Sequence, residues 1–283
     1  MGIVLKSLIV QERFSLRKVD LIYLAAGRGS RLGELTTEKP KCFVNIFGKS
    51  LIEYFLRLKN HPLVGDVNVV AGYKHECFDV YQGVNLLNNA NWANTNMVHS
   101  LRIALENDSS AKPLLIVYSD IFLNPLEWDK IIEEVAKNKY IFCPSYANWK
   151  KLWSRRMENP LNDLESFRLK DGFLIEIGGE VKEMVEIEGQ FMGVLGVPAN
   201  RKAVFKDALD DYLLTKEDAT STTDFLQFLI KKKEKIKVIQ YGGVWFEVDS
   251  QTDVEVYQSL FQTHPTDIYE LIESKKLKFF SRR

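Results

Sequence analysis

The stretch LAAGRGSRL at residues 24–32 decides how this chain folds and what it can bind. It follows the apolar run LIY at residues 21–23, which predicts a buried strand that ends where the glycines begin. Glycine carries no Cβ, so the backbone can turn sharply and approach a ligand closely. Consecutive free N–H groups in such a turn form a concave anion site. Together with the cations Arg31 and Lys41, the stretch predicts a loop that holds a polyphosphate.

Two common phosphate-binding loops fit this stretch poorly. A dinucleotide-binding turn needs G-x-G-x-x-G, but here the third glycine, Gly33, comes one residue late. A P-loop needs G-x-x-x-x-G-K-[ST], and although GKS at residues 48–50 matches its end, Phe43 stands where the first glycine belongs. The ordered series LAAGRGSRL, then KPK at 39–41 and GKSLIE at 48–53, instead resembles the nucleotidyltransferases that make activated sugars and activated polar head groups.

The resemblance extends over about residues 20–260 and implies an architecture. We expect a Rossmann-like (GT-A-like) three-layer α/β/α fold with a mixed, mostly parallel central sheet and a small inserted acceptor-binding lobe. Strand and helix patterns that alternate along the chain also indicate an α/β fold. The expected domain covers 19–265, with the insertion at about 146–190. An N-terminal extension (1–18) and a C-terminal tail (266–283) flank it.

Hydrophobic periodicity predicts the elements of this domain. Strands are expected at 20–25, 66–71, 84–87, 114–118, 140–144, 166–169 and 173–177, and an apolar, core-like run at 191–197. Helices are expected at 51–58, 96–106, 126–138, 199–214, 222–233 and after residue 249. Gly242 and Gly243 favour a hairpin between strands at 235–240 and 244–248. Thr95 is expected to cap the helix at 96–106, and Thr222 or Thr223 the helix at 222–233.

Composition restricts the class of protein further. The 283 residues suit one large domain, or a domain with a small lobe, and 38 basic residues balance 38 acidic ones. A neutral chain lacks the basic patch typical of nucleic-acid binding. The three cysteines form no CxxC pair, so neither disulfides nor a zinc site is expected and a reducing cytoplasm fits best. No apolar run approaches the roughly 20 residues that span a bilayer, so membrane insertion is not expected.

Asp120 and Asp249 each end a strongly apolar stretch, at the sheet edge where α/β folds place their ligands. Mg²⁺ takes oxygen ligands and also binds substrate phosphates, so carboxylates there suit a magnesium site. Each aspartate alone is explained as well by a helix or turn cap; together with the glycine loop they favour metal. Asp249 lies in a W-x-E-x-D setting at 245–249, and the two look like the family's pair of metal-binding carboxylates.

Lys41 is the best candidate for a cation that stabilises the transition state. The implied reaction is attack of a substrate phosphate on the α-phosphorus of a nucleoside triphosphate, which needs positioning and charge neutralisation rather than a covalent group. A lysine is a compact point charge suited to phosphate. Lys39 and Lys49 are explained as solvated surface residues. Arg31 resembles the family arginine that contacts the triphosphate.

The resemblance also assigns a nucleotide site. Gly72 and Tyr73 follow a strand, where the family places a turn against the base. Asn96 and Ser100 match a T-N-x-x-x-S-L pattern of the cytidylyltransferase branch, although a helix cap with a buried serine explains Ser100 equally well. The expected nucleotide-binding residues are Leu24, Ala25, Ala26, Gly27, Gly29, Ser30, Arg31, Lys41, Gly72, Tyr73, Asn96 and Ser100.

The insertion is rich in tryptophan, arginine and acids, which leaves more than one interpretation open. A basic-aromatic nucleic-acid patch is disfavoured by the neutral chain and the acids nearby. The tryptophans also suit an ordinary core. Alternatively, arginine grips a phosphate or phosphonate while tryptophan and acid receive a cationic amine. The series W-S-x-R at 153–156, D-x-E-S-F at 163–167 and I-E-G-Q-F-M-G at 187–193 resembles the cytidylyltransferases that act on phosphocholine and on phosphonates such as 2-aminoethylphosphonate. The expected acceptor-binding residues are Trp149, Trp153, Arg156, Asp163, Glu165 and Gln190.

These features predict a Mg²⁺-dependent cytidylyltransferase that joins CMP from CTP to a small phosphorylated or phosphonate head group and releases pyrophosphate. Lys41, Arg31 and Asp120 would be catalytic, and Asp120 and Asp249 would hold Mg²⁺. CTP and the acceptor are the expected partners, and a homodimer is possible. The nearer alternative is a sugar-1-phosphate nucleotidylyltransferase using another triphosphate; the further one is a non-catalytic nucleotide-binding regulator.

Overall fold

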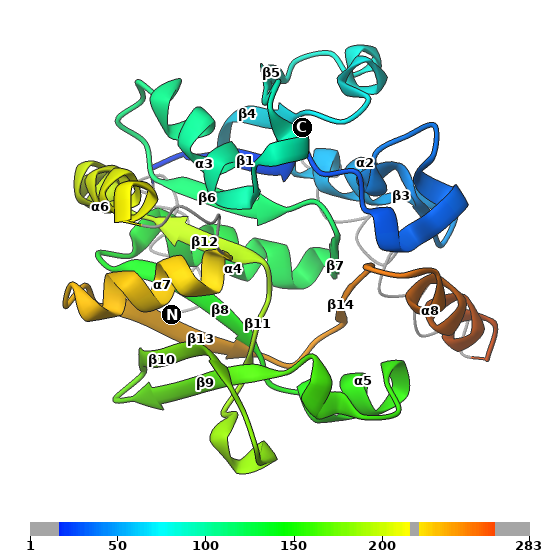
Figure 1. Ribbon diagram of the computed structural model, residues 1–283. Helices are drawn as coiled ribbons and strands as arrows, with labels where there is room; N and C mark the ends of the chain where they lie inside the picture. The colour runs from blue at the N-terminus through cyan, green and yellow to red at the C-terminus, as the bar shows by residue number, and fades with distance from the viewer. Residues whose placement is uncertain (1–16, 216–220, 264–283) are drawn as a thin grey trace, which may run out of the picture.

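A ten-stranded sheet organises the protein, with helices packed on both its faces (Figure 1). It is seen in a computed structural model that describes residues 17–215 and 221–263. The predicted extension up to residue 16 and the predicted tail lie outside the described residues. In sheet order the strands are β5 (Asn85–Asn88), β4 (Val64–Ala71), β1 (Val19–Ala25), β6 (Leu114–Tyr118), β12 (Val194–Val197), β8 (Ile141–Tyr146), β13 (Ile236–Tyr241), β10 (Phe173–Glu180) and β9 (Glu165–Lys170), and β11 (Gln190–Phe191) pairs with β8.

The first half of this sheet, from β5 to β6, is parallel, and its strand β1 is buried throughout. β1 pairs in parallel with β4 and β6, and each of its residues is buried, as expected for a strand with helices on both faces. Leu24 lies opposite Val70 on one side and Tyr118 on the other. The carboxyl ends of these strands therefore meet at one edge, which is the edge that α/β folds use for ligands.

The helices form the outer layers and confirm the predicted α/β/α arrangement. They are α2 (Leu51–Leu56), α3 (Met97–Glu106), α4 (Pro125–Lys137), α5 (Trp149–Arg156), α6 (Lys202–Thr215), α7 (Thr222–Lys231) and α8 (Gln251–Thr263). α3, α6 and α7 pack against one another on one face of the sheet, and α4 lies behind it in Figure 1. None of the helices within 17–215 and 221–263 is long and apolar enough to cross a membrane.

Two predicted helix caps are wrong by one residue. The N-cap of α3 is Asn96, whose Oδ1 accepts from the backbone N–H groups of Val98 and His99, while Thr95 precedes it. The N-cap of α7 is Ser221, which forms a capping box with Asp224. Threonine, serine and asparagine all cap well, so adjacent candidates cannot be ranked by residue type alone.

The predicted hairpin around Gly242 and Gly243 is also wrong. β13 pairs in parallel with β8 on one side and antiparallel with β10 on the other, so both its edges are occupied. The chain instead crosses to form a separate ladder, in which β14 (Trp245–Glu247) pairs antiparallel with β7 (Ile121–Leu123). Trp245 is fully buried there, and its Nε1 donates to the carbonyl of Met192 at 3.1 Å. Two glycines indicate a turn, but the strand with which β14 pairs depends on which sheet edge is unoccupied.

The segment expected to be a small inserted lobe contributes directly to the main sheet. β9 and β10 pair antiparallel with each other, and β10 joins them to β13. α5 precedes these strands and packs against α8. In Figure 1 this part of the chain lies below the first half of the sheet. Both halves of the sheet therefore border the edge at which the parallel strands end.

Candidate active site

The glycine loop lies directly after β1 and is shaped by its contact with Lys41. Gly29 has φ 77° and ψ 52°, a left-handed conformation that other residues rarely adopt. A Cβ at this position would lie 2.6 Å from Cβ of Lys41. Glycine is therefore needed twice, once for the backbone angle and once for the close approach. The contact holds the lysine beside the loop, as the sequence predicts.

The loop is tied to the neighbouring strand ends. The N–H of Tyr73 donates to the carbonyl of Ala26 at 2.9 Å, and Thr36 Oγ1 donates to the carbonyl of Gly29 at 3.1 Å. At Gly72, a Cβ would lie 2.6 Å from Cβ of Trp92. Gly72 and Tyr73 thus lie beside the loop, and the missing side chain lets Trp92 approach it.

The two predicted metal carboxylates come together through the β7–β14 ladder. Asp120 immediately precedes β7, and Asp249 lies two residues beyond the end of β14. Glu247 pairs with Ile121, and the N–H of Val248 donates to the carbonyl of Asp120 at 2.8 Å. Residues far apart in sequence are thereby placed at one site.

Lys41 lies between these two carboxylates. Its Nζ contacts Asp120 Oδ2 directly and lies 3.7 Å from Asp249 Oδ1. A guanidinium nitrogen of Arg31 lies 3.3 Å from the same oxygen of Asp249. The side chain of Lys41 is 14% exposed, whereas that of Arg31 is 70% exposed and free to turn toward a ligand. The structure thus brings together the residues predicted to be catalytic.

Burial and neighbouring charges together shift the pKa values of Lys41, Asp249 and Glu247. Burial lowers the pKa of Lys41, but the negative charges of Asp120 and Asp249 outweigh it, so the net shift is upward and the lysine stays protonated. Burial together with the charge of Asp120 raises the pKa of Asp249, although Lys41 and Arg31 oppose the shift. Glu247, which lies near both aspartates, also has a raised pKa, because of burial first and then the carboxylate charges. The site therefore concentrates negative charge that further cations would relieve.

The donor set suits Mg²⁺. Asp120 Oδ1 is buried and has no hydrogen-bond partner among the described residues, so one carboxylate oxygen remains available. No group of three or more His, Cys, Asp or Glu residues that could hold a metal occurs in the described chain. Mg²⁺ is commonly held by one or two carboxylates, with substrate phosphates and water completing its shell. Asp120 and Asp249 match that kind of site.

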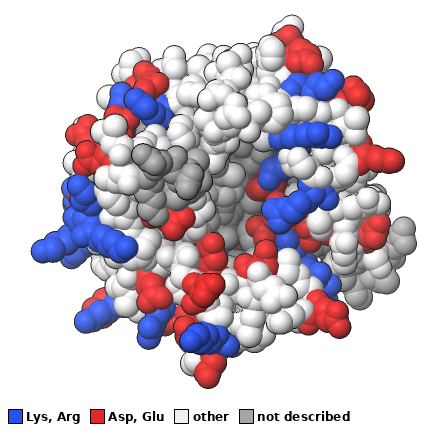
Figure 2. Space-filling view, in the orientation of Figure 1, with Lys and Arg blue, Asp and Glu red and all other residues white. Residues whose placement is uncertain are grey.

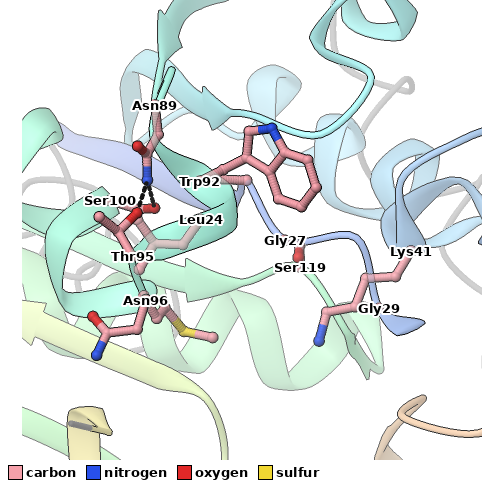
Figure 3. A pocket seen from close by; sticks show the side chains of 12 residues that line it. Leu24, Gly27, Gly29, Lys41, Asn89, Trp92, Thr95, Asn96, Ser100 and Ser119 are labelled. Atoms are coloured by element: carbon pink, nitrogen blue, oxygen red, sulfur yellow. Dashed lines mark hydrogen bonds between the residues drawn. The ribbon is translucent and has the colours of Figure 1, made fainter. Parts of the chain in front are cut away.

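A cavity extends from Lys41 along the carboxyl ends of the strands. Figure 3 shows Lys41 at one end and Asn89, Thr95 and Ser100 at the other. The lining residues are Leu24, Ala26, Gly27, Gly29, Lys41, Asn89, Trp92, Thr95, Asn96, Met97, Ser100 and Ser119. Most of the predicted nucleotide residues are among them. In the same orientation as Figure 1, the surface is hollowed near its centre, with Lys and Arg along one side and Asp and Glu below (Figure 2).

Sequence reasoning missed Asn89 and Trp92. Asn89 directly follows β5, its N–H donates to the carbonyl of Ala71 at 2.8 Å, and its side chain is buried. The signal was present, since a polar residue after a strand of a parallel sheet lies at the ligand edge. The strand itself was predicted at 84–87, one residue short of its end, so Asn89 was not recognised as the residue that directly follows it.

The residues predicted to bind the acceptor divide into two groups. Trp149 and Trp153 are buried in the main core, and Trp153 stacks on Trp245 with ring centroids 6.0 Å apart. Its Nε1 donates to Asp163 Oδ2 at 3.0 Å. Both tryptophans are therefore core residues, as one of the interpretations of the sequence proposed. Arg156 is buried in ion pairs with Glu247 and Asp253, so its guanidinium is not presented to a ligand.

Glu165 and Gln190, the first residues of β9 and β11, lie side by side. Gln190 Nε2 donates to the carbonyl of Glu165 at 3.3 Å. Burial raises the pKa of Glu165, and a hydrogen bond from Thr223 opposes the shift. Burial raises the pKa of Tyr118, and the charges of Asp120 and Glu165 add to the shift. The Tyr118 ring meets the ring of Phe191 edge-on, with the centroids 5.5 Å apart. The Tyr118 hydroxyl is thus within electrostatic reach of both Asp120 and Glu165.

Fold and site together define a nucleotidyltransferase. Residues 21–174 match the family model of the MobA-like NTP transferase domain, and the chain belongs to that family. The CTP:phosphoglutamine cytidylyltransferase of Campylobacter jejuni is 32% identical over 252 residues, which cover 84% of this chain and 98% of the relative. The choline-phosphate cytidylyltransferase of Streptococcus pneumoniae is 36% identical over 88 residues, 30% of this chain and 38% of the relative.

Solved structures confirm the fold. The CTP:phosphocholine cytidylyltransferase from Streptococcus pneumoniae aligns with a TM-score of 0.65 at 21% identity, covering 88% of this chain and 99% of that one. The inositol-1-phosphate CTP transferase from T. maritima aligns with a TM-score of 0.66 at 16% identity, covering 87% and 97% of the two chains. At these identities the likeness supports the fold alone.

We expect Gly29→Ala to lose activity because the new Cβ displaces Lys41 from the loop. Gly48→Ala is a matched control, since Gly48 also has a positive φ, 80°, but no atom lies within 4 Å of a Cβ there. Both variants should lose about 1–2 kcal/mol of unfolding free energy from the left-handed backbone. Only Gly29→Ala should slow pyrophosphate release strongly. Equal activities of the two variants would contradict this role of the Lys41 contact.

Proposed function

We propose that this protein is a Mg²⁺-dependent cytidylyltransferase that transfers CMP from CTP to a small phosphorylated head group. The observation that carries the proposal is the placement of Lys41 between Asp120 and Asp249 at one end of a cavity. At the other end, Ser100 and Asn89 offer polar groups to a base. Similarity along nearly the whole length of a CTP-dependent relative supports the same reaction.

The reaction forms one phosphorus–oxygen bond and breaks another. An oxygen of the acceptor phosphate attacks the α-phosphorus of CTP. The bond between that phosphorus and the oxygen bridging to the β-phosphate breaks, and pyrophosphate leaves with the bonding electrons. Since this step needs charge compensation rather than a covalent intermediate, fixed cations at the α-phosphate dominate the catalysis.

Each charged residue has a distinct part in this scheme. Lys41, fixed by the glycine loop, offsets negative charge on the α-phosphate as the pentacoordinate state forms. Arg31, largely exposed, turns to the departing phosphates. Asp120 and Asp249 would hold Mg²⁺, which would neutralise phosphate charge when bound. The N–H groups of the glycine loop orient the triphosphate.

Hydrogen-bond directions in the cavity favour cytosine. Asn89 Oδ1 accepts from the N–H of Asn91, which turns Nδ2 toward the hydroxyls of Thr95 and Ser100, at 3.0 and 3.1 Å. Because Ser100 Oγ accepts this bond, its own hydrogen is available as a donor. Cytosine offers acceptors at N3 and O2, whereas uracil presents an N–H at position 3. In this proposal the Ser100 hydroxyl faces position 3 of the ring, where a donor suits CTP better than UTP.

The acceptor lies on the other side of the carboxylates, in this proposal. Its phosphate faces the metal site, and its polar end extends past Tyr118 and Phe191 toward Glu165 and Gln190. A carboxylate beside aromatic rings suits an amine or amide group. The names of the relatives point the same way, to phosphoglutamine and phosphocholine. We therefore expect a small phosphorylated or phosphonate compound with a nitrogen-containing end.

A pyrophosphate-release panel tests the substrate class. Four nucleoside triphosphates would be combined with phosphocholine, phosphoglutamine, 2-aminoethylphosphonate, inositol-1-phosphate and hexose-1-phosphates. We expect turnover with CTP and a nitrogen-containing phospho-acceptor. Turnover confined to a hexose-1-phosphate would instead indicate a sugar-1-phosphate nucleotidylyltransferase. Nucleotide binding without turnover on any acceptor would favour a regulator.

Asp120→Asn should lower the rate of pyrophosphate release by about two to three orders of magnitude, because several kcal/mol of charge stabilisation are lost with the metal ligand. Circular dichroism should show an intact fold. Asp171→Asn serves as the control, since Asp171 is exposed in a turn between β9 and β10. Near-normal activity of Asp120→Asn would remove Asp120 from the metal site.

Ser100→Ala should lower the preference for CTP over UTP, measured as a ratio of kcat/KM values, by about tenfold, the effect of one hydrogen bond. The rate with saturating CTP should change less. Ser154→Ala, at an exposed position on α5, controls for loss of a serine elsewhere. An unchanged ratio would exclude Ser100 from base recognition.

A further inference from the structure

Arg156 is a buried cation in a position that the reaction scheme does not use. It ends α5, and its side chain is only 1% exposed. Its Nε donates to Asp253 Oδ1 at 2.8 Å, and a terminal guanidinium nitrogen donates to Glu247 Oε1 at 2.7 Å. The guanidinium also lies over the ring of Trp153, 5.0 Å from its centroid. A single side chain thus binds two carboxylates from different elements.

The other oxygen of Asp253 holds the chain beside Asp249. Asp253 Oδ2 accepts from the N–H of Asp249 at 3.1 Å and from the N–H of Ser250 at 2.9 Å. It also accepts from Ser250 Oγ at 2.9 Å. One carboxylate therefore links the Arg156 guanidinium to the backbone of the predicted metal ligand.

Arg156 holds the chain on both sides of Asp249. Glu247, its second partner, lies two residues before Asp249 at the end of β14, and Asp253 lies four residues after it in the first turn of α8. The planar fork of arginine can bond two carboxylates at once, which an ammonium group does with less geometric definition. The buried tryptophans Trp149 and Trp153 fix the helix that carries it.

We propose that Arg156 is a positioning residue that fixes Asp249 for metal binding, and not an acceptor-binding residue; this inference rests on the proposed metal role of Asp249. If an acceptor phosphate bound the Arg156 guanidinium, Glu247 and Asp253 would stay buried without their cation. Leaving buried carboxylates unpaired costs folding free energy. The segment around α5 is therefore connected to the catalytic centre through the Arg156–Asp253–Asp249 contacts, while acceptor recognition lies with other residues.

Metal binding itself provides the test. Mn²⁺ binding would be measured by electron paramagnetic resonance on the full chain, in the presence of a CTP analogue with a methylene group between the α- and β-phosphates. Arg156→Met should weaken Mn²⁺ binding at least tenfold and raise the Mg²⁺ concentration for half-maximal turnover by a similar factor. The KM for the acceptor, measured at saturating Mg²⁺, should change less than twofold. Arg156→Lys should recover part of the loss.

Two further variants keep the test decisive. Arg155→Met changes the neighbouring exposed arginine and should behave as wild type. Asp253→Asn is nearly isosteric and should weaken Mn²⁺ binding in the same direction, so it carries the test together with Arg156→Lys if Arg156→Met does not fold. Unchanged Mn²⁺ binding with a tenfold higher acceptor KM would overturn the proposal and make Arg156 an acceptor residue.

The same measurements separate this inference from the proposed function. If wild type binds Mn²⁺ and Asp249→Asn does not weaken it, the metal role of Asp249 fails, and the positioning role fails with it. If Asp249→Asn weakens Mn²⁺ binding but neither Arg156→Lys nor Asp253→Asn does, only the positioning role is overturned.

Discussion

The contact of Lys41 with Asp120 and Asp249 is the interaction on which the rest of the site depends. The buried ammonium is tolerated because two carboxylates compensate its charge at short range. Three separate pieces of the fold must meet to form it: the glycine loop after β1, the turn before β7 and the end of β14. The order of strands in the main sheet and the small β7–β14 ladder together bring these three pieces to one place.

The same group of charges explains why the site suits a cation and a polyphosphate together. The carboxylates of Asp120, Asp249 and Glu247 repel one another, and burial strengthens the repulsion. Lys41 and Arg156 compensate part of this charge from opposite sides. A divalent ion would relieve the remainder, and a triphosphate would in turn balance that ion.

Local patterns predicted much of the fold and the centre of the site. The apolar run before the glycine loop, the lysine after Pro40 and the aspartates after apolar strands all lie where their sequence context indicates. Three features escaped prediction. The partner of β14 depends on which sheet edge is free, which no local pattern records. Trp153 and Arg156 have the composition of a ligand pocket, but burial and the partners Glu247 and Asp253 decide their role. Asn89 follows a predicted strand whose end was placed one residue too early, and a local pattern does not fix strand ends to one residue.

The β7–β14 ladder also has a consequence for how the protein is made. It joins a turn near the middle of the chain to a strand close to the C-terminal end of the described residues. Strands β1, β4, β5 and β6 have all left the ribosome well before Asp249 is synthesised, and contacts between distant parts of a chain form slowly. A growing chain can therefore assemble the cavity beside the glycine loop early, while it still lacks Asp249. Nascent chains that end before Asp249 therefore carry only part of this group of charges.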